Sequence, residues 1–212
     1  MSDRNEIASA GGAVEMPGFR LLFPPGWTKH DATEESEREL LARSRAKIKN
    51  YARPDLDFTL TSSIKTAFRQ LRSQDGIAMY LPTDVDERSI LPMSMTASRL
   101  LDPAGAPLDS HIAAVIKNHD GGFLGDDHQI VRWRRTHRRL EGMPGAVNQQ
   151  INYAIPVAGT ARRMALLLST SILQDTEQSV DDDSLTLMIE LSDSIVGTFT
   201  WESSLVPATR RD

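Results

Sequence analysis

Apolar residues follow a helical period in some segments of this chain and alternate with polar residues in others. Between Pro54 and Ser73 they recur every three or four positions, which predicts an amphipathic helix with one apolar stripe. The segment Thr33–Asn50 has acidic residues in its first turns and basic residues in its last, an order that complements a helix dipole. Its apolar content is thin, so we expect this helix to lie on a surface or to cover an edge. Two further helices are predicted over Leu108–Asn118 and Ser184–Val196.

Alternating patterns predict several strands. In the segment Ile90–Ser98, methionine and alanine occupy one set of alternate positions, and serine and threonine occupy the other. Three later strands are joined by short turns, and short connections between consecutive strands imply antiparallel pairing in a meander. Within them, Met164–Leu168 is apolar on both faces, which suits a central strand. The predicted strands are Phe19–Phe23, Ile77–Leu81, Ile90–Ser98, Gln129–Leu140, Gln149–Pro156 and Arg162–Ile172.

The boundaries between these elements also have sequence signals. Two prolines and a glycine end the first strand, because proline lacks the N–H that a ladder needs, and we expect Trp27 to pack back on the core. Asp31 and Glu34 resemble a capping box at the start of the next helix. The segment His119–His128 is rich in glycine and aspartate, and we expect it to be a loop.

The predicted elements indicate a single α+β domain. Their order is β-α-α-β-β-α-β-β-β-α, in which strands come in runs instead of alternating strictly with helices. We therefore predict a mainly antiparallel sheet with helices on its faces. A chain of 212 residues is long enough for one domain. We place that domain at residues 17–202 and expect flexible tails at residues 1–16 and 203–212.

Composition excludes several kinds of chemistry. The chain has no cysteine, which removes disulfides, thiol catalysis, thiolate zinc sites and iron–sulfur clusters. Its formal net charge is −5, so a generally basic protein that coats nucleic acid is disfavoured. No run of about 18 apolar residues occurs, so we predict no membrane-spanning helix. No targeting signal is recognisable, and we predict a cytoplasmic location.

The sequence contains no phosphate-binding loop, dinucleotide fingerprint, zinc-protease motif or nucleophile elbow. Its nearest approach to a metal site is the segment His119–His128, which offers imidazole and carboxylate groups. Their spacing matches no standard pattern of metal ligands, so we predict no cofactor. The weak metal candidates are His119, Asp126, Asp127 and His128.

The densest positive run lies on the predicted strand Gln129–Leu140. Side chains alternate along a strand, so its odd-numbered residues share one face and its even-numbered residues the other. Guanidinium groups bind carboxylates in a bidentate manner, and Trp133 could stack on a base. We favour a simpler interpretation, in which the arginines protect an edge and pair with acids such as Glu34–Glu39. The candidates for binding an acidic protein partner are Arg132, Trp133, Arg134, Arg135, His137 and Arg139.

Three segments together resemble a known superfamily. Residues 18–27 read GFRLLFPPGW, residues 164–171 read MALLLSTS, and residues 191–201 read LSDSIVGTFTW. This pattern resembles the PsbP-like (Mog-type) superfamily of α/β/α sandwiches, whose relatives include LpqN- and DcrB-like bacterial lipoproteins. Without a signal peptide or lipobox cysteine, the chain would be a non-lipoprotein bacterial member. The resemblance implies a role in binding or adapting other proteins, and it assigns no functional residues.

These observations leave several hypotheses about function. We favour a non-enzymatic domain that binds another protein as an adaptor or assembly factor. The alternative is a small-ligand carrier or enzyme, with a pocket between the sheet and the helix Pro54–Ser73 and with His119, Asp126 or His128 at its mouth. A third hypothesis is a homo-oligomer in which the first helix packs on a second copy. Nucleic acid is the weakest candidate partner, because the net charge is negative.

Overall fold

The computed structural model describes residues 15–48, 54–84, 91–138, 145–175 and 182–202. Its helices are α1 (Glu34–Ile48), α2 (Pro54–Ser73), α3 (Asp109–Asn118) and α4 (Asp182–Gly197). Its strands are β1 (Phe19–Arg20), β2 (Trp27–Asp31), β3 (Gly76–Pro82), β4 (Met93–Leu101), β5 (Gly122–Leu124), β6 (Ile130–His137), β7 (Ala146–Pro156), β8 (Met164–Asp175) and β9 (Thr200–Trp201).

Seven strands form one antiparallel sheet in the order β2-β3-β4-β8-β7-β6-β5. The predicted meander is confirmed, because β6, β7 and β8 are consecutive neighbours in this order. The apolar segment Met164–Leu168 begins β8, which is the middle strand, as its two apolar faces predict. The α+β class with a mainly antiparallel sheet is therefore confirmed.

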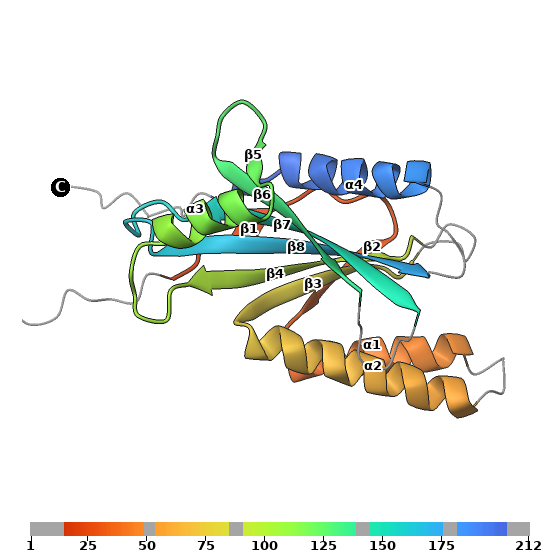
Figure 1. Ribbon diagram of the computed structural model, residues 1–212. Coiled ribbons are helices and arrows are strands. Elements are labelled where there is room, and N and C mark those ends of the chain that lie inside the picture. The colour runs from red at the N-terminus through yellow and green to blue at the C-terminus, as the bar shows by residue number, and fades with distance from the viewer. Residues whose placement is uncertain (1–14, 49–53, 85–90, 139–144, 176–181, 203–212) are drawn as a thin grey trace, which may run out of the picture.

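Helices cover both faces of this sheet. Alternate residues of the strands point to opposite faces, and one face forms the main core with α4. That core includes Ile151 and Tyr153 of β7, Leu166 and Leu168 of β8, and Met188 of α4. Figure 1 shows α4 on one side of the sheet and the α1–α2 pair on the other. A smaller cluster packs Val115 of α3 on β6 and β7.

The helices α1 and α2 pack on each other and on the β2–β3 end of the sheet. Their small core joins Leu40 of α1 to Ile64, Phe68 and Leu71 of α2 and to Met79 of β3. The thinly apolar α1 thus lies at an edge, as its composition predicts. The turn into β3 is tight, because a side chain on Gly76 would collide with the backbone of Leu71. Among the described residues, no helix is both long and apolar enough to cross a membrane.

Several short elements differ from the prediction. The first strand covers only Phe19–Arg20 and pairs with β9, outside the main sheet. Trp27 packs against the main core, as predicted, but it also begins the edge strand β2, which was not predicted. The expected loop His119–His128 contains β5, which pairs with the start of β6. Each of these strands has five residues or fewer, so periodicity gives little signal.

The start of α1 also differs from the prediction. Thr33 caps the helix, because its hydroxyl accepts a hydrogen bond from the Ser36 amide at 3.2 Å. Asp31 is instead the last residue of β2 and pairs with Lys29. Met16, placed in the predicted tail, packs against the main core. The rest of both predicted tails, residues 1–14 and 203–212, lies outside the described residues.

Candidate ligand-binding cleft

A cavity of about 670 Å³ lies between α2 and the sheet face opposite α4. We call it the open-face cleft. The sequence hypothesis of a pocket between the sheet and the Pro54–Ser73 helix is therefore met by a real cavity. Figure 1 shows the ends of β6 and β7 extending toward the α1–α2 pair, and residues of both regions line the cleft. The sheet thus supplies a floor, α2 supplies one wall, and α3 contributes His111 to the lining.

The floor of the cleft consists of polar side chains aligned across four neighbouring strands. Residues that lie directly opposite each other in β4, β8, β7 and β6 form two parallel rows. The first row is Thr96, Ser169, Asn152 and Trp133, and the second row is Ser94, Ser171, Gln150 and Arg135. All eight line the cleft. An antiparallel sheet face that carries hydroxyls and amides usually faces water, but this face is half covered by helices.

Three buried polar atoms in this lining have no hydrogen-bond partner among the described residues: Trp133 Nε1, Asn152 Nδ2 and Asn148 Oδ1. The side chains of Trp133 and Asn152 are each only 4% exposed. The other amide atoms are engaged, since Asn152 Oδ1 accepts from the Ser169 hydroxyl at 2.8 Å and Asn148 Nδ2 donates to the Ser171 hydroxyl at 3.4 Å. An unpaired buried polar atom costs about 1–3 kcal/mol. The lining of the cleft therefore leaves two buried donors and one buried acceptor unpaired among the described residues.

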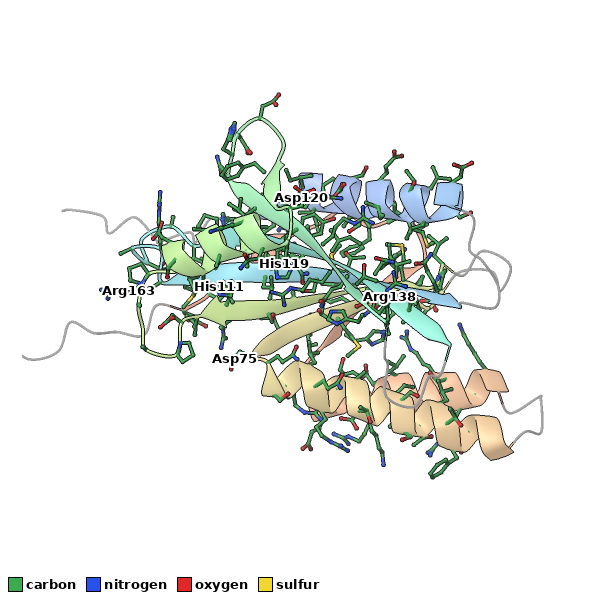
Figure 2. The ribbon with its side chains drawn as sticks, in the orientation of Figure 1. Asp75, His111, His119, Asp120, Arg138 and Arg163 are labelled. Carbon is green, nitrogen blue, oxygen red and sulfur yellow. The ribbon has the colours of Figure 1, made fainter. Side chains whose placement is uncertain are left out.

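The α2 wall of the cleft differs in chemical character from the floor. On the α2 side the lining includes the apolar residues Ile64, Phe68 and Leu71, together with the polar residues Ser63 and Gln70. Of the described residues that line the cleft, Arg135 and His111 are ionisable and none is a carboxylate. Figure 2 shows His111 on α3. The cleft combines a mixed apolar and polar wall on α2 with a polar floor that carries Arg135 at its β6 end.

The predicted pocket-mouth residues lie elsewhere, which corrects that part of the hypothesis. His119, Asp126 and His128 are not in the lining of the open-face cleft. His128 instead borders a second, largely apolar cavity of about 320 Å³ beside α3. Its Nδ1 contacts the Asp126 carbonyl at 2.7 Å, and Asp127 accepts a hydrogen bond from the Gln129 amide at 3.2 Å. Within the described ranges, no three His, Asp or Glu side chains gather as metal ligands.

The basic strand has side chains of two kinds, because alternate positions face opposite sides of the sheet. Arg132 faces α4, where it pairs with Asp193 at 2.6 Å instead of with the Glu34–Glu39 acids. Trp133 is buried, so it cannot stack on a base.

The other side chains of the basic strand are accessible, and Arg134 and Arg135 are exposed at successive positions. His137 contacts Gln150 at 3.1 Å, whereas Arg139 lies outside the described residues.

On the α4 side of the sheet, a polar network surrounds Tyr153. Its hydroxyl lies 2.7 Å from both Ser192 Oγ and Asp193 Oδ1, and Ser192 donates to Thr170 at 2.7 Å. Burial raises the pKa of the Tyr153 phenol above its usual range, and Asp193 adds to this. Burial opposes the charged form of Arg132, but its contacts with Asp193 raise its pKa overall. These groups satisfy one another and hold α4 on the sheet.

No protein-family model matches the chain, and no curated protein matches it in sequence. A search of solved structures finds a point mutant of the protein Mog1, with a TM-score of 0.42 and 11% sequence identity. The match covers 87% of this chain and 96% of that chain. The α+β class follows from the strands and helices themselves, and the function is inferred below from the cleft's own residues.

Proposed function

We propose that this protein is a binding protein that holds a small molecule in the open-face cleft. One observation carries the proposal: two rows of mostly hydroxyl and amide side chains floor a half-covered cavity, and three buried polar atoms there have no hydrogen-bond partner among the described residues. Buried polar groups in proteins are nearly always hydrogen-bonded, so exceptions gathered in one cavity need an explanation. A bound polar molecule provides one.

The two faces of the same strands support this interpretation. On the α4 side, β8 presents Leu166, Leu168 and Ile172 to a filled apolar core. On the cleft side, the intervening residues of β8 include Ser169 and Ser171, although α2 stands over that face. Apolar residues there would let α2 pack on the sheet and close the cavity. The polar floor keeps the cavity open, and its volume falls in the range of about 300–1,000 Å³ that is typical of small-molecule pockets.

The proposal can be tested by closing the cleft from either side. Ser171→Leu places an apolar side chain on the floor, and Ala67→Phe projects a ring from the exposed cleft face of α2. Native mass spectrometry of the wild type, after exposure to a small-molecule extract of its own source, should show a bound mass. Both variants should lose that mass.

A matched control keeps this experiment interpretable. Ser194→Leu makes the same chemical change on the exposed side of α4, away from the cleft, and should keep the bound mass. Circular dichroism and thermal unfolding establish that each variant folds. A wild type that binds nothing, or cleft variants that bind as the wild type does, would show that the cleft is not a ligand site.

A second candidate function is binding of an acidic protein partner, and the basic strand favours it. Arg134 and Arg138 are exposed, and no carboxylate of the described residues pairs with either of them. Figure 2 shows Arg138 at the end of β6. If this surface binds the partner, affinity capture at low and moderate salt should retain one stoichiometric protein. The double variant Arg134→Glu and Arg138→Glu should release it, whereas Ser171→Leu should not.

A further inference from the structure

The lining of the open-face cleft changes in chemical character across the strands. It is apolar at Met79 and Leu81 of β3, carries hydroxyls on β4 and β8, carries amides on β7, and ends at Arg135 on β6. Adjacent strands lie about 4.8 Å apart, so the distance from β4 to β6 is about 14 Å along the sheet. A molecule that matched this sequence of groups would be elongated and would lie across the strands.

The β6 end of the lining is positively charged through Arg135, although the net charge of the chain is −5. Arg135 is exposed, and no ion pair joins it to any carboxylate of the described residues. It lies directly opposite Gln150, which continues the polar row toward Ser171. An arginine guanidinium binds a carboxylate in a planar, bidentate manner, and none of the described residues that line the cleft is an acid that would repel one.

We propose that the ligand of the open-face cleft is an elongated amphipathic acid. Its apolar end lies against Ala67 and Leu81, its polar middle meets the hydroxyl and amide rows, and its carboxylate binds Arg135. The inference rests on the proposed function, since it names the ligand class of the same site. A peptide strand is a poorer occupant, because the floor is a sheet face whose main-chain groups already pair within the ladder.

A pair of fluorescent probes tests the charge requirement. Dansyl-6-aminohexanoate has an aromatic end, a polar sulfonamide and a terminal carboxylate, and its primary amide is the same molecule without the charge. Titration of the wild type should show the carboxylate binding about tenfold more tightly than the amide, because a charge-assisted contact is stronger than a neutral one. Arg135→Gln should remove this preference, because it should lower the affinity for the carboxylate probe and leave the affinity for the amide probe unchanged.

Two further sets of variants separate the possible outcomes. Arg134→Gln removes the same charge one residue away on the other face of β6, and it should leave both affinities unchanged. Ser171→Leu and Ala67→Phe should weaken both probes by about tenfold or more, because they fill the cavity. Suppose that these two variants bind neither probe but Arg135→Gln changes neither affinity. The proposal of an acidic ligand is then wrong, and the cleft remains a binding site. If neither probe binds the wild type, or the filling variants bind as the wild type does, both proposals are overturned.

Discussion

The Tyr153 hydroxyl connects a central strand to α4 through two partners at once. Its contacts with Ser192 and Asp193 lie within a core in which Tyr153 itself is fully buried. Asp193 also receives the Arg132 guanidinium, and Ser192 reaches Thr170 on β8. Polar groups in such a network strengthen one another, and removal of one leaves the others less well satisfied.

Tyr153→Phe should therefore lower the free energy of unfolding by about 1–2 kcal/mol. The loss is moderate because Ser192 keeps Thr170 and Asp193 keeps Arg132. Chemical denaturation measures it. Tyr80→Phe is the matched control, since the Tyr80 hydroxyl makes no hydrogen bond with the described residues, and its loss should be smaller. Equal losses in both variants would show that the network around Tyr153 adds nothing.

His30 predicts a pH dependence of stability. Burial lowers its pKa below the ordinary 6.5, Arg43 lowers it further, and the carboxylates of Glu39, Asp84 and Asp31 oppose this. As the pH falls, the imidazole of the unfolded chain takes up a proton near pH 6.5, whereas the imidazole of the folded protein does so only at a lower pH. Its contribution to stability is thus complete above about pH 6.5 and is lost as the pH falls through the folded-state pKa.

The unfolding free energy, measured from about pH 7.5 to about pH 5.5, should fall in the wild type. His30→Gln removes the titrating group and should flatten this part of the profile. His111→Gln, on the exposed surface of α3, should keep the decline because His30 is intact. An unchanged slope in His30→Gln would assign the pH dependence to other groups.

At the scale of the elements, α1 is attached to the molecule through little buried surface. Leu40 is its buried apolar residue among those described, and it joins Ile64, Phe68 and Leu71 of α2. The central strand β8, by contrast, is paired on both sides and contributes several fully buried residues. Elements with few buried contacts open locally at a lower free energy than the core does. We expect α1 to open while the sheet stays folded.

Native-state hydrogen exchange should show this difference as faster exchange in α1 than in β8. Leu40→Ala removes the anchoring side chain and should lower the opening free energy of α1 by about 2–3 kcal/mol. Exchange in β8 should stay unchanged. Leu41→Ala, one position along the same helix and only partly buried, is the control and should have a smaller effect. Equal acceleration in both elements would mean that α1 unfolds only with the whole domain.

Elements with a long repeating pattern were predictable from the sequence, and short elements were not. The apolar stripe of α2 and the alternation in β4 each extend over enough residues to reveal their period. The strands β1, β5 and β9 have only two or three residues, and they exist because a partner strand pairs with them. The edge strand β2 carries Lys29 and Asp31, so its polar pattern resembles that of a loop.

At the scale of the whole molecule, the candidate site was predictable only in part. Alternation along a strand predicts that Ser94 and Thr96 share one face, and that Gln150 and Asn152 share one too. A polar face normally indicates water, however, and the cover over this one depends on contacts such as Leu40 with Phe68 that no local pattern encodes. Trp133 Nε1 and Asn152 Nδ2 have no hydrogen-bond partner among the described residues, and this can be recognised only in the folded structure, where the strands are aligned and the helices are in place.

The pairing of β1 with β9 brings the two ends of the domain together. Phe19 lies opposite Trp201, and the Glu202 amide donates to the Gly18 carbonyl at 2.7 Å. Both strands pack on the core that faces α4, whereas the open-face cleft lies on the opposite face of the sheet. A polypeptide that leaves where it entered can be inserted into a surface loop of a host protein with little distortion of either fold. Because residues 18 and 202 are adjacent, we expect residues 18–202 to tolerate such an insertion, with the junction on the side of the sheet opposite the open-face cleft.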